Sequence, residues 1–347
     1  MCMKKIVIVG SNCIHTKKYI SMISDYFEEI YFLTNKPDGL SGIIFKCVSF
    51  SLNISGLLSV ITIRKYLKEI QPSVVHIHQA NSYAFITMLA LIGTTYPVVL
   101  SAWGSDVLVN PKRSVIFKWM LKWILKHSSI VTSDSLYMSS EVKQYCQSVS
   151  TIEASFGISS ESKNEFEKEN IIYSNRNHEL LYNVDKIIFA FAKFSENHDN
   201  WKFVIASSGS ETTRLKQLVV SLGIKDKVEF IGWVSQEKNN ELYQKSSIFV
   251  SIPSSDATSI SLLEAISQNC ICVVSNLPAN TEHILHGING LIVQDIDNMD
   301  FEQYIDIDVP LLEKVNMRRS ETYTVDYNKN IFLSIYKSLL MNKTGSF

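Results

Sequence analysis

Short apolar runs that alternate with helical patterns are the feature that most constrains the fold of this chain. In the first half, these runs have the length of buried strands and lie at 6–10, 29–34, 73–79, 97–106 and 129–135. Helical patterns separate them, one starting near His15 and others at 57–70 and 112–127. Strands that alternate with helices in this way predict a parallel, doubly wound sheet.

The same alternation restarts in the second half. Strands are predicted at 171–176, 201–209, 227–233, 247–254 and 270–276, with helices at 184–195, 211–222, 237–245 and 260–268. A polar join near 150–168 separates the halves, and an amphipathic helix covers 325–341. We therefore expect an α/β protein with two Rossmann-like domains, at 1–155 and 156–325, that face a central cleft. A C-terminal helix at 326–347 is expected to pack back on the first domain.

The composition narrows the class of protein. Of the 347 residues, 46% are hydrophobic and 19% are charged, which is typical of a globular chain. The formal net charge of -1 argues against a nucleic-acid partner. The six cysteines form no C-x-x-C pair, and no apolar run reaches the length of a membrane span or a signal-peptide core. These features predict a cytoplasmic location.

The segment 251–293 contains the strongest functional signal. A predicted strand ends at Pro253, a loop of small residues follows, and a helix starts near Ser259. Small residues let the backbone approach a ligand, and the N–H groups at a helix start attract phosphate. The residues expected to hold a phosphate through their backbone amides are Ala257, Thr258 and Ser259.

Two carboxylates flank this predicted phosphate site. Asp256 lies in the loop, and Glu264 lies between one and two turns into the helix. A carboxylate at that place can accept hydrogen bonds from the two hydroxyls of a ribose. One alternative is a capping box formed by Ser261 and Glu264, in which the glutamate only stabilises the helix start, and the other is that Glu264 is simply a surface residue.

The spacing of these residues resembles the family 4 retaining glycosyltransferases, which have the two-domain GT-B fold. In that family a glutamate, seven further residues and a second glutamate precede a short helix, a V-V strand and a G-x-N-G turn. Here Asp256, seven residues and Glu264 precede CICVVSN at 270–276 and the turn at 287–290. The order of strands, helices and glycine turn over 203–254 also matches, and the similarity extends over essentially the whole chain.

The resemblance implies retaining transfer of a sugar from a nucleotide diphosphate, UDP- or GDP-linked, to an acceptor hydroxyl. It assigns Arg176 and the glycine turn at Gly209 to donor binding, Asp256 to the sugar hydroxyls and Glu264 to the ribose. The first domain would bind the acceptor, which the family suggests is a lipid-linked glycan of bacterial surface polysaccharide such as O-antigen or capsule. The family uses no bound divalent metal and the donor is a co-substrate, so neither a metal nor a cofactor is expected.

The sequence departs from the family pattern in several places, and Ala257 and Ser259 replace the glycines that follow the first acidic residue. Asp256 is one methylene shorter than glutamate, Tyr182 and Asn183 occupy the place of the family lysine, and Trp103 stands where many members have histidine. Two alternatives therefore stay open. One is a non-catalytic subunit of this fold that supports another transferase, and the other is a nucleotide-sugar epimerase.

Three polar residues of the first domain are candidate catalytic residues because each lies just past a predicted strand. They are His15, His78 and Asp106. For each, the alternative is local capping or a structural, hydrogen-bonded histidine. His76 alternates with His78 in the same strand, so the two cannot be judged independently.

Two D-x-D pairs, at 295–297 and 306–308, match a pattern that some sugar transferases use to hold a metal. Both lie in an acidic stretch that is not next to a strand end. We therefore interpret them as solvated loop.

The predicted helix at 112–127 has an unusual surface. Its basic face is formed by Lys118, Lys122 and Lys126. Trp119 and Trp123 flank that face, and basic residues beside tryptophan suit an anionic membrane surface. Our hypothesis is peripheral attachment to the inner face of the cell membrane. The alternative is a helix packed on the sheet with its lysines in water.

Overall fold

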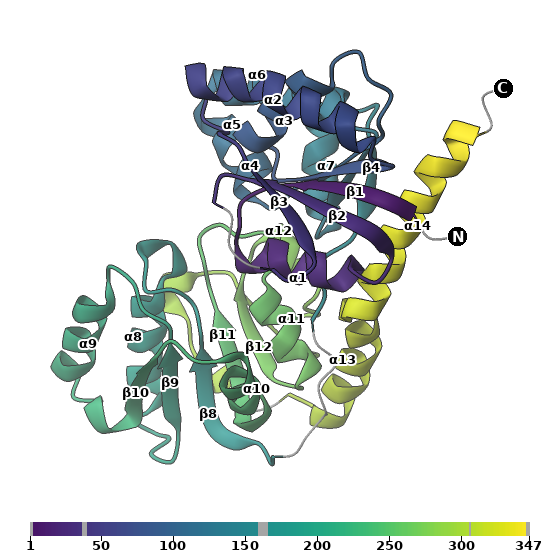
Figure 1. The fold of residues 1–347 in the computed structure, drawn as a ribbon. Helices are drawn as coiled ribbons and strands as arrows, with labels where there is room; N and C mark the ends of the chain where they lie inside the picture. Colours follow the sequence, from purple (N-terminus) through teal and green to yellow (C-terminus); the bar gives the residue numbers. More distant parts are fainter. Residues whose placement is uncertain (1–2, 37–39, 159–165, 305–306, 345–347) are drawn as a thin grey trace. The chain divides into compact units, whose positions relative to one another are not determined.

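The computed structural model describes residues 3–36, 40–158, 166–304 and 307–344. The chain divides into two compact units, the first formed by Met1–Gly157 with Val325–Phe347 and the second by Ile158–Thr324. In sequence order, the second unit is therefore inserted into the first. Each unit has its own hydrophobic core, and Figure 1 labels the elements of both.

The first unit is built on a seven-stranded sheet in the order β3-β2-β1-β4-β5-β6-β7, with parallel pairing throughout. Its strands are β1 (Met3–Val9), β2 (Phe27–Thr34), β3 (Ile43–Cys47), β4 (Val74–His78), β5 (Val98–Ser101), β6 (Ile130–Ser133) and β7 (Ser150–Glu153). The inner strands β4 and β5 are buried along their whole length. Helices that cover both faces of a parallel sheet explain why such strands read as continuous apolar runs.

Helices cover both faces of this sheet. They are α1 (Ile14–Ile23), α2 (Ile54–Ile70), α3 (Ser82–Leu91), α4 (Ser105–Leu108), α5 (Asn110–Arg113), α6 (Val115–Lys126), α7 (Leu136–Tyr145) and α14 (Val325–Thr344). Tyr19 of α1 and Phe332 and Tyr336 of α14 share one core cluster with Ile8 of β1. In Figure 1, α2, α3 and α6 lie on the opposite side of the strands from α1, and α3 contacts both of its neighbours.

The second unit has a six-stranded parallel sheet in the order β10-β9-β8-β11-β12-β13. Its strands are β8 (Glu169–Ser174), β9 (Lys202–Ala206), β10 (Val228–Gly232), β11 (Ser246–Ser251), β12 (Ile271–Ser275) and β13 (Gly290–Val293). Its α-helices are α8 (Val184–Phe194), α9 (Thr212–Ser221), α10 (Gln236–Lys245), α11 (Ile260–Ser267), α12 (Pro278–Thr281) and α13 (Val309–Tyr323). The chain builds outward from β8 to β10 and then returns to place β11 on the other side of β8. The strand order therefore reverses between β8 and β11.

The predicted helix at 112–127 is wrong in one respect. The structure divides this segment into α5 and α6, because Ser114 between them is extended, with φ -147° and ψ 127°.

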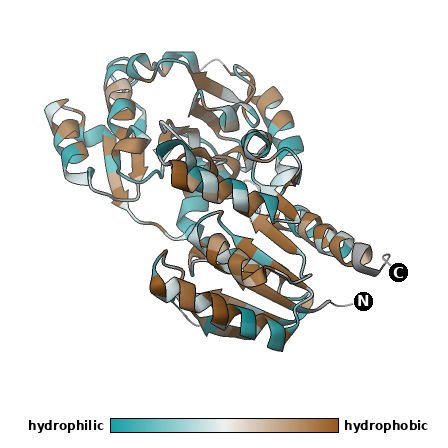
Figure 2. Cartoon of the chain, turned by 90° about the horizontal axis from the view of Figure 1, so that it is seen from above, coloured by the Kyte–Doolittle hydropathy of each residue, from teal (hydrophilic) through white to brown (hydrophobic). Residues whose placement is uncertain are grey.

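Figure 2 shows mostly brown, hydrophobic strands and helices that mix brown with teal, as expected for amphipathic helices on buried sheets. Among the described residues, no helix is long and apolar enough to cross a membrane.

Candidate active site

Residues predicted to bind a nucleotide diphosphate gather at the carboxyl ends of β8 and β11. Arg176 follows β8 by two residues, and Asp256 and Ser259 lie in the loop that leads from β11 to α11. Carboxyl ends of neighbouring parallel strands meet at one edge of a sheet, and a crevice for ligands forms where the strand order reverses. Residues 80 positions apart in sequence are therefore in direct contact here.

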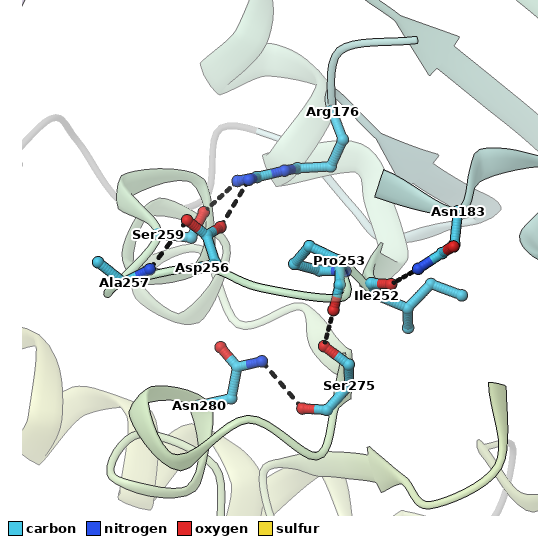
Figure 3. Close-up of polar contacts among 9 residues, drawn as sticks. All are labelled: Arg176, Asn183, Ile252, Pro253, Asp256, Ala257, Ser259, Ser275 and Asn280. Carbon is cyan, nitrogen blue, oxygen red and sulfur yellow. Dashed lines mark hydrogen bonds and ion pairs between the residues drawn. The ribbon is translucent and has the colours of Figure 1, made fainter. Parts of the chain in front are cut away.

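The guanidinium of Arg176 binds this loop through two of its nitrogens (Figure 3). Nη2 donates to Oδ2 of Asp256 at 2.6 Å, and Nη1 donates to Oγ of Ser259 at 2.6 Å. The third nitrogen, Nε, is buried and has no hydrogen-bond partner among the described residues. A buried charged donor without a partner is energetically unfavourable, and an anionic ligand would satisfy it.

Asp256 is the counter-charge of this arginine. Burial raises the pKa of Asp256, whereas the Arg176 guanidinium and the backbone N–H of Ala257, which donates at 3.0 Å, oppose the rise. The two charges are held together where little water reaches them, since the Arg176 side chain is 11% exposed. Asp256 therefore positions the arginine, and its predicted contact with sugar hydroxyls stays a prediction.

Tyr182 and Asn183 occupy the place of the family lysine and support the same loop. The Tyr182 ring stacks on Arg176, whose Cζ lies 4.4 Å from the ring centroid. Nδ2 of Asn183 donates to the carbonyl of Ile252 at 2.8 Å and to Oγ of Ser254 at 3.0 Å. Neither role was predicted from the sequence. The signal in the sequence was weak: asparagine adopts a left-handed backbone more readily than most residues. In the structure, Asn183 has this conformation, with φ 53°.

The loop between β11 and α11 is held from its other side by β12 and α12. Oγ of Ser275 donates to the carbonyl of Pro253 at 2.8 Å, and Nδ2 of Asn280 donates to the carbonyl of Ser275 at 2.9 Å (Figure 3). The predicted phosphate-binding residues are all buried: Ala257, Thr258 and Ser259. Ser259 is the N-cap of α11, but its side chain accepts from Arg176 and makes no capping bond. The first N–H groups of α11 thus lack a cap from this side chain.

Glu264 lies in the second turn of α11 and contacts α10. Its carboxylate accepts hydrogen bonds from Nε2 of Gln236 at 2.9 Å and from Nδ2 of Asn239 at 3.3 Å. These two amides, which the sequence analysis did not identify, fix the orientation of the carboxylate. Because the N-cap of α11 is Ser259, Ser261 lies inside the helix, and the alternative of a Ser261–Glu264 capping box is wrong.

Gly209 lies where the loops that follow β8 and β9 touch. A Cβ atom at this position would lie 2.4 Å from the carbonyl oxygen of His178 and 2.6 Å from Oε1 of Glu179. Only glycine allows the two loops to approach this closely. The close packing explains why glycine stands at this position, and its role in donor binding stays a prediction.

Replacing Gly209 with alanine should destabilise the second unit by about 1–3 kcal/mol, because the new methyl group forces the two loops apart. Urea unfolding followed by far-UV circular dichroism measures this change. Ser208→Ala in the same loop is the matched control, since the backbone carbonyl of Ser208 still accepts from the N–H of His178. An unfolding midpoint in Gly209→Ala equal to that of the control would contradict the close-packing explanation.

In the first unit, His15 and His78 share one aromatic cluster with Trp103 and Phe156. The Trp103 ring centroid lies 5.6 Å from each histidine ring, and that of Phe156 lies 6.0 Å from His15 and 5.8 Å from His78. His78 is fully buried, and neither ring nitrogen has a partner in the part of the chain that the structure describes. Burial lowers the pKa of His78 to about 3. His15 is exposed, but its contacts with the aromatic rings remove part of its hydration; this desolvation, followed by the charge of Lys18, lowers the pKa of His15.

His76 has a different environment from His78, although the two rings stack 4.7 Å apart. Its Nδ1 lies 2.7 Å from the hydroxyl of Tyr19 and 2.5 Å from that of Tyr336, and its Nε2 lies 2.8 Å from Oγ of Ser101. His76 is thus a hydrogen-bonded structural histidine that links α14 to the sheet.

Asp106 holds two strand-end loops together. Its buried carboxylate accepts from the backbone N–H groups of Ala80 at 2.7 Å, Gly104 at 2.9 Å and Trp103 at 3.1 Å. Burial raises the pKa of Asp106, and these N–H groups oppose the rise. This is the local capping that was the alternative to a catalytic role, and it positions Trp103 beside the histidines.

The D-x-D pairs serve as local caps where they are described. Asp295 accepts from the N–H of Asp297 at 3.0 Å and from Nδ2 of Asn298 at 2.7 Å, and Asp308 caps α13 through the N–H of Leu311 at 3.0 Å. Asp306 lies outside the described residues. Over the described ranges, no cluster of three or more His, Cys, Asp or Glu side chains could hold a metal ion.

Comparisons with known proteins agree with this geometry. Residues 156–313 match the family described as glycosyl transferases group 1, and residues 5–135 match the glycosyl transferase 4-like family. The chain is 23% identical over 266 residues to N-acetyl-alpha-D-glucosaminyl L-malate synthase of Bacillus anthracis, covering 72% of this chain and 68% of that protein.

A second relative is an enzyme of Campylobacter jejuni, GalNAc-alpha-(1->4)-GalNAc-alpha-(1->3)-diNAcBac-PP-undecaprenol alpha-1,4-N-acetyl-D-galactosaminyltransferase. It is 31% identical over 194 residues, which is 54% of this chain and 50% of that protein. The crystal structure of HepE from Anabaena with UDP and glucose matches the fold with a TM-score of 0.78 at 12% identity, covering 97% of this chain and 100% of HepE.

The predicted fold, with two parallel-sheet α/β domains of the GT-B type, is confirmed by these matches. The two family models together span most of the chain and converge on one activity. The chain therefore belongs to the group 1 glycosyltransferases.

Proposed function

We propose that this glycosyltransferase moves a sugar from a nucleotide diphosphate to an acceptor hydroxyl with retention of the anomeric configuration and without a bound metal or other cofactor. The observation that supports the proposal best is the convergence of Arg176, the uncapped start of α11 and Glu264 beside the strand-order reversal. A cation and backbone N–H groups suit a diphosphate, and an oriented carboxylate suits a ribose.

In this proposal the bond between the anomeric carbon and the diphosphate oxygen breaks, and the acceptor oxygen bonds to the same carbon on the same face. The difficult step is separation of the anionic diphosphate from a sugar with oxocarbenium character. Arg176 and the N–H groups of Thr258 and Ser259 stabilise the leaving group, joined by the N–H of Ala257 once it is released from Asp256, and Asp256 contacts the sugar hydroxyls. The acceptor proton passes to the leaving phosphate, so no separate base is required.

The relatives support a more specific proposal for donor and acceptor. HepE was solved with UDP, so a uridine nucleotide is the first donor to test, with GDP-linked sugars second. The Campylobacter relative acts on an undecaprenol-linked glycan, which supports a lipid-linked acceptor and a cytoplasmic role in surface polysaccharide synthesis. We assign acceptor binding to the first unit, where His15 and His78 lie in the aromatic cluster.

Replacing Glu264 with glutamine should weaken binding of the nucleoside diphosphate by about 10- to 100-fold, because a charged acceptor for the ribose hydroxyls is lost while the shape is kept. Isothermal titration with UDP and GDP, without added metal, measures this change. Glu313→Gln on α13 is the matched control, since Glu313 is exposed on another helix of the same unit. Unchanged affinity in Glu264→Gln would contradict the ribose role.

Turnover distinguishes the proposal from its alternatives. Release of nucleoside diphosphate that depends on an added acceptor supports the transferase. Tight binding without any turnover favours a non-catalytic subunit, and conversion of the donor sugar without an acceptor favours an epimerase.

A further inference from the structure

The helix α2 presents an apolar strip to solvent. Ile54, Leu57, Leu58 and Ile61 recur at the spacing of one helical face, and each is 58 to 77% exposed. An apolar stripe at this period normally faces a protein core. On α2 the stripe faces solvent instead. A prediction of the buried face of α2 from its apolar spacing alone would therefore be wrong.

The inner face of α2 explains this orientation. Gly56 and Ser59 are buried there, and a Cβ on Gly56 would lie only 1.9 Å from the carbonyl oxygen of Ser51 and 3.4 Å from Cδ1 of Ile86 on α3. Small residues let the helix pack closely against α3. The large apolar side chains of its first two turns are left on the outside as a result.

A second apolar strip lies on α6 in the same layer of helices. Val115, Ile116 and Trp119 are 59 to 83% exposed, while the opposite face of α6 is buried through Met120 and Ile124, among others. The Phe85 ring of α3 lies 6.2 Å from the Trp119 ring and so connects α3 to this strip. Isolated exposed apolar residues need no explanation, whereas strips on neighbouring helices mark an interaction surface.

Charge identifies the kind of partner. From residue 48 to residue 133 the chain contains eight lysines and arginines but only two acidic residues, Glu69 and the buried Asp106. The chain as a whole has a net charge of -1, so positive charge is concentrated in this part. Lys118, Lys122 and Lys126 lie exposed on α6, and two copies of such a surface would repel each other.

We propose that the α2 and α6 strips form a single membrane-binding surface that recognises anionic lipid. The exposed leucines, isoleucines and tryptophan enter the boundary between headgroups and acyl chains, and the lysines contact the phosphates. Only the α6 part of this surface was predicted from the sequence. The inference is independent of the proposed donor chemistry, which involves residues of the second unit.

Flotation of the full chain with lipid vesicles tests the proposal. The parent should bind vesicles of equal parts phosphatidylcholine and phosphatidylglycerol, and the binding should weaken as salt is raised. Leu57→Gln/Ile61→Gln and Lys118→Ala/Lys122→Ala/Lys126→Ala should each reduce the bound fraction on the order of 10-fold or more. All five side chains are exposed, so the variants should fold and bind UDP as the parent does.

Matched controls come from the second unit. Val220→Gln removes an exposed apolar side chain, and Lys202→Ala/Lys225→Ala/Lys314→Ala removes three exposed lysines. Both should bind vesicles as the parent does. The proposal would be overturned if Leu57→Gln/Ile61→Gln and Lys118→Ala/Lys122→Ala/Lys126→Ala both bound vesicles as well as the parent does. A parent chain that does not bind vesicles would also overturn the proposal. If that chain is a dimer and Leu57→Gln/Ile61→Gln disrupts the dimer, the partner of this surface is a second copy of the chain.

Discussion

Replacing Arg176 with methionine should lower kcat/KM for sugar transfer on the order of 1,000-fold. Methionine keeps much of the length of the side chain but removes the charge that contacts Asp256 and Ser259. The rate falls because the diphosphate loses its cation, and loss of one charged donor to a developing negative charge costs about 4 kcal/mol of transition-state stabilisation, or about 1,000-fold. Separately, the Asp256 carboxylate keeps its charge without a partner, which costs about 3–5 kcal/mol of folding stability.

Three further variants make this result specific. Arg176→Lys keeps the charge but cannot contact Asp256 and Ser259 together, so an intermediate loss is expected. Arg176→Met/Asp256→Asn removes both charges and should recover the stability of the parent without recovering activity. Arg318→Met, on the exposed surface of α13, should behave as the parent. A rate for Arg176→Met within a few-fold of the parent would contradict the assigned contact with the diphosphate.

The free energy of unfolding should decrease as the pH falls from about 6.5 toward about 3. Burial lowers the pKa of His78 from 6.5 to about 3 in the folded chain, and that of His283 from 6.5 to about 4. Between these values the unfolded chain binds protons that the folded chain does not. The stability is therefore complete above the unfolded pKa and is progressively lost below it, by up to a few kcal/mol for each histidine.

His78→Phe isolates the contribution of His78. Phenylalanine fits an aromatic cluster and has no ring nitrogen, so the variant should be at least as stable as the parent at neutral pH and lose less stability on acidification. Urea unfolding at a series of pH values measures both effects. His127→Gln, an exposed histidine at the end of α6, should keep the pH dependence of the parent. An unchanged pH dependence in His78→Phe would show that another group controls acid stability.

Much of the fold could be predicted because buried parallel strands read as apolar runs. The strands of the first unit that were not predicted are the edge strands β3 and β7. Both are only partly buried, and their apolar runs are short: three residues in β3 (IIFKC) and one in β7 (STIE). Helix α3 was missed for the opposite reason. Its sequence SYAFITMLAL is apolar on nearly every side, so it shows no helical periodicity.

The candidate site was predictable where residues lie close in sequence and follow a known spacing, as Asp256 and Glu264 do. Its supporting contacts were not, because they join distant segments. Gln236 and Asn239 lie 28 and 25 positions from Glu264. Tyr182 is close to Arg176 in sequence, but its ring meets the guanidinium only because the chain turns back after β8. The absence of the family lysine was visible in the sequence, whereas the aromatic ring that stacks on the arginine could be recognised only in three dimensions.

The insertion of one unit within the other has a consequence for how the protein is made. Phe332, Ile335 and Tyr336 of α14 are buried in the core of the first unit, although they are synthesised after the whole second unit. Because synthesis runs from the N-terminus to the C-terminus, the ribosome completes the inserted second unit before it completes the first unit. Until α14 emerges, the nascent first unit exposes the apolar face that α14 later covers, and this interval is when a chaperone would have a surface to bind.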